Sequence, residues 1–376
     1  MNNPRHPPTS INLACYPTEF QQVILEKSLD FIGRNFVFTA VNDFLHCQNR
    51  GYFTIVGTPG SGKSAIMAKY VIDNPGVIYY NLQSIGKNRS EEFFRSICAQ
   101  IAETFAVDIL HTTSISGILQ QVSNQLGLHQ RLIIVLDGLD TINRKSQPPG
   151  SNLFYLPRYL PEKVYFLLTR RPFLKGKSGL LVETPSRILD LNKYTEENRR
   201  DMQIYIQREL LSENNTLTNK NYISKKSIKN ISGESLKEII SSLADVSENN
   251  FIYLSQILPV IAEEFYSNAF QFVDTLHLHN KLPPNLKKYY ETLWQKMVVE
   301  QSTDLALDVL RVLISSVRLR EGVSVEYIAQ IINADEFDVE EVLQMWVEFL
   351  QHKEIGGENY YRLFHSSFCI WLEQNI

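Results

Sequence analysis

The sequence has 376 residues and a net charge of −4, with 44% hydrophobic and 21% charged residues. This length fits two or three domains, and the charge gives no general attraction to nucleic acid or anionic membranes. The four cysteines form no CxxC pair, which favours reduced thiols over a disulfide framework or a zinc site. The start lacks the apolar core of a signal peptide, and no stretch reaches the roughly 18 apolar residues that span a bilayer. We therefore expect a soluble, cytoplasmic protein that does not contact membranes.

Residues 1–30 carry prolines without a sustained hydrophobic period, so we expect them to form an N-terminal arm. From residue 31 to residue 191, short apolar runs alternate with amphipathic segments. The runs that predict buried strands cover residues 52–56, 77–80, 132–136, 164–168 and 188–191. The segments that predict helices cover residues 35–46, 63–72, 90–105 and 115–126. This alternation predicts an α/β domain with a five-stranded parallel sheet covered on both faces.

The second half of the chain is predicted to be mainly helical. Residues 192–300 are expected to form a helical lid domain, with helices over 194–211, 238–243, 251–265 and 286–300 and a polar connection over 212–234. Residues 301–376 predict helices over 305–317, 325–332 and 338–350, with Ser324 as an N-cap, and then a hairpin over 355–364 turned near Gly356. Three helices followed by a hairpin and a last helix are the order of a winged-helix domain.

Residues 57–64 read GTPGSGKS and match the phosphate-loop pattern GxxxxGK[ST]. Glycines let backbone N–H groups turn inward around a phosphate, and the helix that follows directs its positive end at the same anion. Lys63 is expected to reach the β- and γ-phosphates, and the hydroxyl of Ser64 to ligate Mg²⁺. An apolar strand precedes the loop and an amphipathic helix follows it, as this function requires. The loop therefore predicts binding of ATP or GTP with Mg²⁺.

The run LIIVLDGLD over residues 132–140 predicts a buried strand that ends in two acidic residues. Asp137 is expected to hold Mg²⁺ beside the phosphate loop. Asp140 is expected to orient or deprotonate the attacking water. A third run, FLLTRRP over residues 166–172, predicts a strand that ends in Thr169, Arg170 and Arg171. A guanidinium at this place can sense the γ-phosphate and stabilise charge in the transition state.

In their order these motifs resemble the STAND class of P-loop NTPases, the relatives of NACHT and NB-ARC switch proteins. FIGR at residues 31–34 is similar to the box that packs on adenine, and LTRRP at 168–172 is similar to the Thr-Ser-Arg-Pro sensor, which aligns Arg171 with the sensor arginine. FHSSF at 364–368 resembles the histidine motif of the winged helix, which implies that His365 touches the β-phosphate of ADP. The residues expected to contact nucleotide are Ile32, Arg34, Thr58, Pro59, Gly60, Ser61, Gly62, Lys63, Ser64, Ala65 and His365.

The resemblance implies a switch that is ADP-bound and closed at rest, and ATP-bound, open and homo-oligomeric when active. Two departures bear on this expectation. Thr141 stands where many family members carry a second acid, and Asn249, Asn250 and Phe251 stand where a Gly-x-Pro adenine motif is expected. We therefore expect slow ATP hydrolysis. GTP is disfavoured because the chain has no guanine-selecting NKxD sequence.

Two alternatives remain open at this point. One is a scaffold that holds ADP permanently and acts through protein partners. The other is an AAA+-like ATPase that acts on nucleic acid, but residues 300–376 carry five basic against fourteen acidic side chains, a net charge of −9 that repels phosphates. STAND proteins usually carry sensor and effector domains, so we expect a protein partner, or a fused domain outside this sequence, to supply them.

Overall fold

The computed structural model describes residues 13, 15–29, 31–107, 114–142, 147–148, 150–172, 180–211, 233–265, 284–300, 304–316 and 322–376. They form two compact units. The first comprises Met1–Gly57, Lys63–Arg171 and Lys175–Leu191, and the second comprises Thr58–Gly62, a short segment from Pro172, and Asn192–Ile376. The tip of the loop at residues 57–64 thus groups with the second unit.

The first unit is built on a five-stranded parallel sheet, so the predicted α/β fold with a parallel sheet is confirmed. Its strands are β1 (Gly51–Val56), β2 (Ile78–Asn81), β3 (Leu132–Asp137), β4 (Val164–Arg170) and β5 (Ser186–Asp190). They are arranged in the order β2-β3-β4-β1-β5. The strands β1 to β4 are buried along almost their whole length, as expected for a parallel sheet that helices cover.

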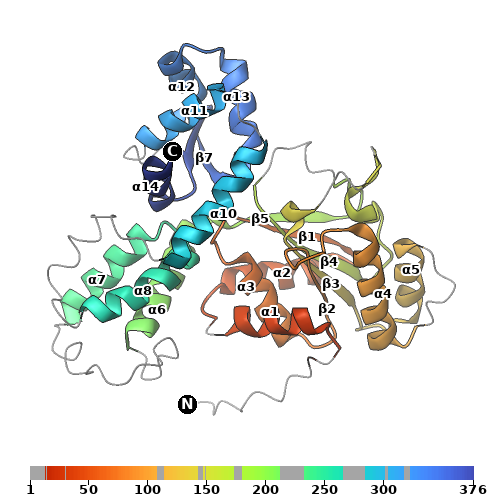
Figure 1. Ribbon diagram of the computed structural model, residues 1–376. Helices are drawn as coiled ribbons and strands as arrows, with labels where there is room; N and C mark the ends of the chain where they lie inside the picture. The colour runs from red at the N-terminus through yellow and green to blue at the C-terminus, as the bar shows by residue number, and fades with distance from the viewer. Residues whose placement is uncertain are drawn as a thin grey trace. The chain divides into compact units, whose positions relative to one another are not determined.

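The helices of the first unit stand close to their predicted positions. They are α2 (Asn35–Cys47), α3 (Lys63–Asp73), α4 (Ser90–Phe105) and α5 (Ile115–Gln125). Figure 1 shows α3 on one side of the sheet and α4 and α5 on the other. Each of these helices has a face of buried apolar residues at helical spacing, which is why the sequence pattern predicted them.

Residues 18–28, for which the sequence pattern predicted no element, form helix α1 (Thr18–Ser28). The pattern missed α1 because only Phe20 and Ile24 on it are buried, which is too few to establish a period. Both are completely buried. The ring of Phe20 lies 5.8 Å from the ring of Tyr79 and 5.3 Å from that of Tyr80, both on β2. This part of the predicted N-terminal arm therefore packs on the core of the first unit.

The second unit combines helices with a small antiparallel sheet. The helices are α6 (Thr195–Leu211), α7 (Gly233–Val246), α8 (Phe251–Phe265), α10 (Pro284–Glu300), α11 (Asp304–Ser315), α12 (Val325–Ile332), α13 (Glu336–Met345) and α14 (Ser366–Asn375). The strands β6 (Val323–Ser324), β7 (Leu350–Ile355) and β8 (Glu358–Leu363) pair in the order β6-β8-β7. One cluster of buried hydrophobic residues extends from Met202 to Leu372.

Several predicted elements of the second unit differ in their bounds. The helix predicted over 238–243 extends over Gly233–Val246, and residues 212–232 of the predicted polar connection lie outside the described residues. The helix predicted over 338–350 ends at Met345, because a short turn at Val347–Phe349 leads into β7 instead. The hairpin exists, with Gly356 and Gly357 both at positive φ in its turn. Ser324 caps α12 as predicted.

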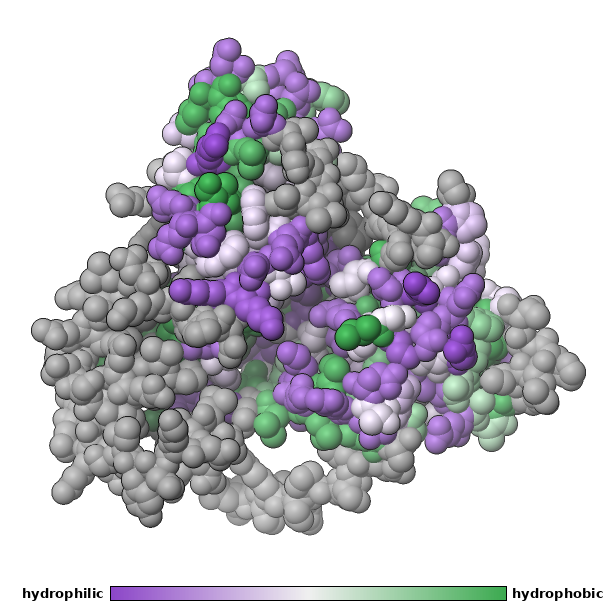
Figure 2. Space-filling model, in the orientation of Figure 1, coloured by the Kyte–Doolittle hydropathy of each residue, from purple (hydrophilic) through white to green (hydrophobic). Residues whose placement is uncertain are grey.

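Helices α12 and α13 carry some exposed hydrophobic side chains, among them Tyr327, Ile331 and Phe337. Figure 2 shows green hydrophobic side chains among purple hydrophilic ones in this region. Among the described residues, no helix has both the length and the apolar character needed to span a membrane.

Candidate functional site

The loop at residues 57–64 connects β1 to α3 and turns through two glycines in the left-handed region. Gly60 and Gly62 adopt positive φ angles of 82° and 89°, which other residues rarely reach. The N–H of Gly57 donates to the carbonyl of Arg170 at 3.3 Å, and the N–H of Ser61 donates to that of Thr58 at 3.2 Å. Because α3 begins at Lys63, the N–H groups of its first turn lie at the end of the loop.

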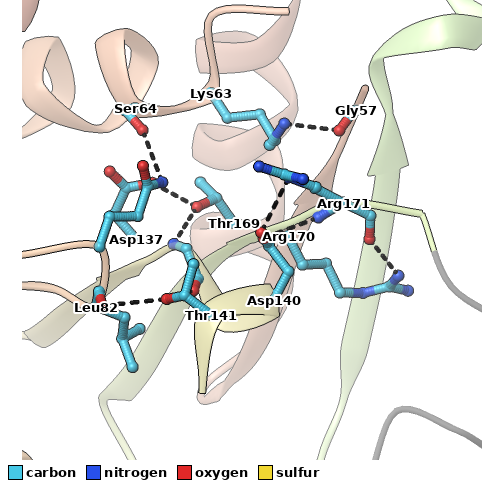
Figure 3. Close-up of polar contacts among 12 residues, drawn as sticks. Gly57, Lys63, Ser64, Leu82, Asp137, Asp140, Thr141, Thr169, Arg170 and Arg171 are labelled. Atoms are coloured by element: carbon cyan, nitrogen blue, oxygen red, sulfur yellow. Dashed lines mark hydrogen bonds and ion pairs between the residues drawn. The ribbon is translucent and has the colours of Figure 1, made fainter. Parts of the chain in front are cut away.

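Lys63 folds back over the loop that precedes it. Its Nζ donates to the carbonyl oxygen of Gly57 at 2.6 Å (Figure 3). The ammonium group is therefore held across the mouth of the loop by a backbone oxygen. A hydrogen bond from an ammonium group to a phosphate oxygen is stronger than one to a carbonyl oxygen, because the phosphate oxygen is charged. This position suits the predicted contact between Lys63 and a phosphate.

Asp137 ends β3 as a completely buried carboxylate. The hydroxyl of Thr169 donates to its Oδ1 at 2.5 Å, and the side chains of Tyr79 and Asn81 lie 3.4 Å from its Oδ2. Burial raises the pKa of Asp137, and hydrogen bonds from Thr169 and Ser64 oppose this rise in part. The carboxylate thus stands beside Ser64 in the first turn of α3. That the two side chains hold Mg²⁺ remains a prediction.

The strand order explains why these groups meet. Strand β4 lies between β1 and β3, so Thr169 near its carboxyl end is flanked by the loop on one side and Asp137 on the other. Thr169 Oγ1 accepts the N–H of Gly138 at 2.8 Å while donating to Asp137. The sequence motif contained Thr169, but its role as the hydrogen-bond link between the motifs depends on the strand order.

Two further polar residues of the site, Asn81 and Gln83, were missed by sequence reasoning. Asn81 ends β2, and Gln83 Nε2 lies 3.4 Å from Ser64 Oγ. The sequence signal that could have identified them is a pair of amide side chains at the end of an apolar strand and just after it. Gln83 also explains the glycine after Asp137: Gly138 has a φ of 90°, and a Cβ there would lie 2.7 Å from Gln83 Cγ.

Asp140 and Arg171 are paired with each other. Arg171 Nε lies 3.1 Å from Asp140 Oδ2, and the backbone N–H of Arg171 donates to Asp140 Oδ1 at 3.1 Å (Figure 3). The side chains are only 13% and 9% exposed. The residues predicted to act on water and on the γ-phosphate therefore neutralise each other in this structure. Thr141, in place of a second acid, donates to the carbonyls of Leu82 and Gly138.

Arg170, the alternative sensor residue, is half-buried, like Arg171. Its Nη1 donates to the carbonyl of Arg171 at 3.1 Å. Burial lowers the pKa of Arg170 to about 10, and the charges of Asp190 and Asp140 oppose that decrease. These contacts hold Arg170 against the end of the sheet.

The residues 31–34 have an unusual backbone at the start of α2. Gly33 and Arg34 follow each other with φ angles of 70° and 62°. Glycine adopts such an angle freely, whereas for Arg34 it is costly unless the surroundings impose it. Ile32 is half-buried, and Arg34 is only 2% exposed, with its guanidinium carbon 5.9 Å from the ring centre of Phe36. Packing of adenine on Ile32 and Arg34 remains a prediction, as does a backbone contact from half-buried Ala65.

His365 precedes α14 and is completely buried in the second unit. Its Nε2 lies 3.2 Å from the carbonyl oxygen of Ser247, and its Nδ1 accepts the N–H of Ser367 at 3.1 Å. Both ring nitrogens thus have protein partners in this structure. A direct contact between His365 and ADP remains a prediction that would require one of these partners to be replaced.

The donor set fits Mg²⁺. The hydroxyl of Ser64 and the carboxylate of Asp137 supply oxygen ligands, which Mg²⁺ prefers, and a small number of protein ligands is usual for this ion beside nucleotide phosphates. The positive charge of Lys63 lies at the same edge of the sheet, where it would face such phosphates.

No protein-family model matches the chain, and no curated protein matches it. Among solved structures it is similar to a chain of "Structure of Drosophila ORC bound to DNA", at 12% sequence identity and a TM-score of 0.40 over 94% of this chain and 98% of that chain. Similarity at this level carries no argument about function. The class that the fold defines is an α/β protein with a five-stranded parallel sheet, compatible with a P-loop NTPase.

Proposed function

We propose that this chain is an ATP-binding regulatory switch of the STAND type. In this proposal residues 31–191 are the P-loop nucleotide-binding domain, 192–300 the helical lid and 301–376 a winged-helix domain. The order of elements from α11 to α14, with β6 before α12 and a hairpin after α13, supports the winged helix. The switch alternates between a closed ADP-bound state and an oligomeric ATP-bound state, with slow ATP hydrolysis between them.

One observation carries the proposal: three separate sequence motifs meet at the carboxyl edge of the sheet. Lys63 comes from the loop after β1, Asp137 from the end of β3, and Arg171 from the end of β4. Thr169, at the end of β4, links that strand to Asp137 and Gly138 at the end of β3 by hydrogen bonds. A chance phosphate-loop sequence has no reason to be accompanied by this arrangement of polar groups.

The proposed roles follow from the positions of the side chains. Lys63 neutralises the β- and γ-phosphates, and Ser64 and Asp137 hold Mg²⁺, which polarises the phosphate oxygens when it is bound. Arg171 directly follows β4, whose last residue pairs with the end of β1 just before the loop. Its guanidinium contacts Asp140. Its transfer from Asp140 to the γ-phosphate would free Asp140 to orient water, so hydrolysis is slow because it requires this exchange.

The decisive test compares Lys63→Ala with Lys69→Ala in the same helix. Lys69 forms an exposed ion pair with Asp73, so its loss leaves the loop intact. Wild-type protein and Lys69→Ala should co-purify with ADP or ATP, identified by mass spectrometry, and Lys63→Ala should not. We expect nucleotide affinity to fall by at least about 100-fold, equivalent to roughly 3 kcal/mol, on loss of a charged phosphate contact. Equal retention by the two variants would refute the site.

The pairing of Asp140 with Arg171 also favours a second candidate, a scaffold that holds ADP permanently. Both carboxylate oxygens of Asp140 contact Arg171, so neither is positioned to take a proton from water, which is consistent with no turnover at all. Tightly bound ADP without ATP turnover in the wild-type protein would support the scaffold. Turnover stimulated by DNA would instead support an ATPase that acts on nucleic acid, which the net charge of −9 over residues 300–376 opposes.

A further inference from the structure

The tip of the phosphate loop is held by the turn between α7 and α8. The backbone N–H of Phe251 donates to the carbonyl of Gly60 at 2.9 Å. A Cβ at Gly60 would lie only 2.1 Å from Asn250 Oδ1, and the side-chain amide of Asn250 lies 3.5 Å from the carbonyl of Pro59. Asn250 is 3% exposed. The start of α8 therefore sits directly on the backbone of the loop tip.

Asn250 is itself fixed by its own helix and by Ser247. Its Oδ1 accepts the N–H of Tyr253 at 3.0 Å, the bond of an N-cap, and its backbone N–H donates to the carbonyl of Ser247 at 2.8 Å. Between them Glu248 and Asn249 adopt φ angles of 45° and 64°. Successive residues in the left-handed region persist only where surrounding contacts impose them. The shape of this turn must therefore be held from outside.

His365 supplies such a contact. Since its Nδ1 accepts the N–H of Ser367, the ring proton is assigned to Nε2, which then donates to the carbonyl of Ser247 at 3.2 Å. The ring of His365 also packs on that of Tyr253, with centroids 4.5 Å apart. The carbonyl of Ser247 thus accepts both from Asn250 and from His365. His365 and Ser247 are both completely buried.

A second connection joins the same turn to the same segment. The carboxylate of Glu248 accepts the N–H of Ser366 at 3.2 Å and lies 3.7 Å from Nη1 of Arg362. Residues 362–367 therefore hold the turn at 247–250 from two sides, and the turn holds Gly60. All these residues belong to the second unit.

We infer that Asn250, and His365 acting through Ser247, are positioning residues for the phosphate loop. They set the backbone of the loop tip, so that nucleotide retention depends on two side chains that lie 190 and 305 positions after Gly60 in the chain. His365 then influences ADP without touching it. This inference rests on the proposed function, because it assumes that residues 57–64 bind a nucleotide.

The test is a double-mutant cycle on ADP release. The dissociation rate of a fluorescent N-methylanthraniloyl-ADP is measured by displacement with unlabelled ADP in wild type, Asn250→Ala, His365→Phe and the double variant. Phenylalanine keeps the ring contact with Tyr253 and removes both nitrogen contacts. We expect each single variant to release the analogue roughly tenfold faster, as for one lost buried hydrogen bond. The double variant should be no faster than the faster single one, because both changes act on one network.

Two controls separate positioning from a general loss of structure. Val342→Ala removes two buried methyl groups from α13 and should leave the release rate unchanged. His365→Gln retains a side-chain N–H donor and should restore a rate near that of wild type. If His365→Phe does not fold, Glu248→Ala takes its place in the cycle, because it breaks the other connection of the same turn.

The release rates distinguish indirect positioning of the loop from direct contact between His365 and the nucleotide. Multiplicative effects in the double variant would overturn the inference and indicate that His365 contacts the nucleotide directly. Unchanged release in Asn250→Ala would overturn it as well. If Lys63→Ala loses the analogue while the network variants keep the wild-type rate, only this inference fails. If wild type does not bind the analogue, the proposed function fails with it.

Discussion

The carboxylate of Asp137 lies at the end of β3 with none of its surface exposed, and its hydrogen bonds come from Thr169, Asn81 and Tyr79. Burial raises its pKa, which means that the fold disfavours the ionised form. At neutral pH the ionised group therefore lowers the stability of the chain without a cation. Below the ordinary pKa of aspartate the unfolded group is protonated too, and this cost disappears.

We therefore predict that Asp137→Asn raises the melting temperature of the nucleotide-free protein at pH 7 by about 2–4 °C, corresponding to roughly 1 kcal/mol. The same variant should lose any rise in melting temperature that Mg²⁺ produces in the presence of ATP. Thermal unfolding with and without MgATP measures both effects. Asp73→Asn, which changes an exposed carboxylate, should show neither. A destabilised Asp137→Asn that still responds to Mg²⁺ would contradict the assignment.

At the scale of elements, α1 shows how little sequence signal a structurally important helix can carry. Its contribution to the hydrophobic core consists of Phe20 and Ile24, which are both completely buried, while Leu25 on the same helix is 52% exposed. The hydroxyl of Tyr16, just before α1, also donates to the carbonyl of Val77 at 2.6 Å. Helix α1 is thus attached at the edge of the sheet next to β2.

We predict that Phe20→Ala destabilises the protein by about 3–5 kcal/mol, because it removes a large buried ring in contact with β2. Leu25→Ala should change stability by less than about 0.5 kcal/mol, as is usual for an exposed position. Chemical denaturation of both variants provides the measurement. Equal effects would mean that α1 does not pack as described. A truncated chain that starts at residue 31 lacks α1 and should therefore be unstable.

At the scale of the whole molecule, the proposed switch predicts an assembly that depends on the nucleotide. Sedimentation velocity should show a monomer with ADP and a larger species with a non-hydrolysable ATP analogue. Lys63→Ala should remain monomeric in both conditions, because it lacks the charged contact to the phosphates. A monomer in every condition would argue against the switch and leave the ADP scaffold as the better description.

Local sequence was sufficient for most elements of the first unit. The strands β1 to β4 are continuous apolar runs because helices cover both faces of the sheet, and α4 coincides with the predicted residues 90–105. The glycines of the pattern GTPGSGKS predicted a tightly turned loop, and Gly60 and Gly62 have positive φ angles there, since this backbone geometry is local. These features depend on the period of hydrophobic residues and on turns of a few residues.

The meeting of residues far apart in the chain required the tertiary structure. The order β2-β3-β4-β1-β5 puts Thr169 between the loop and Asp137, and no local pattern encodes which strands become neighbours. For the same reason the sequence pointed to Asp140 and Arg171 separately, but not to their ion pair. It likewise singled out His365, and named Asn250 only as a departure from the family pattern. The shared carbonyl of Ser247 that joins them depends on packing between segments more than 100 residues apart. Residue types determined which chemistry is present, and long-range packing decided which groups meet.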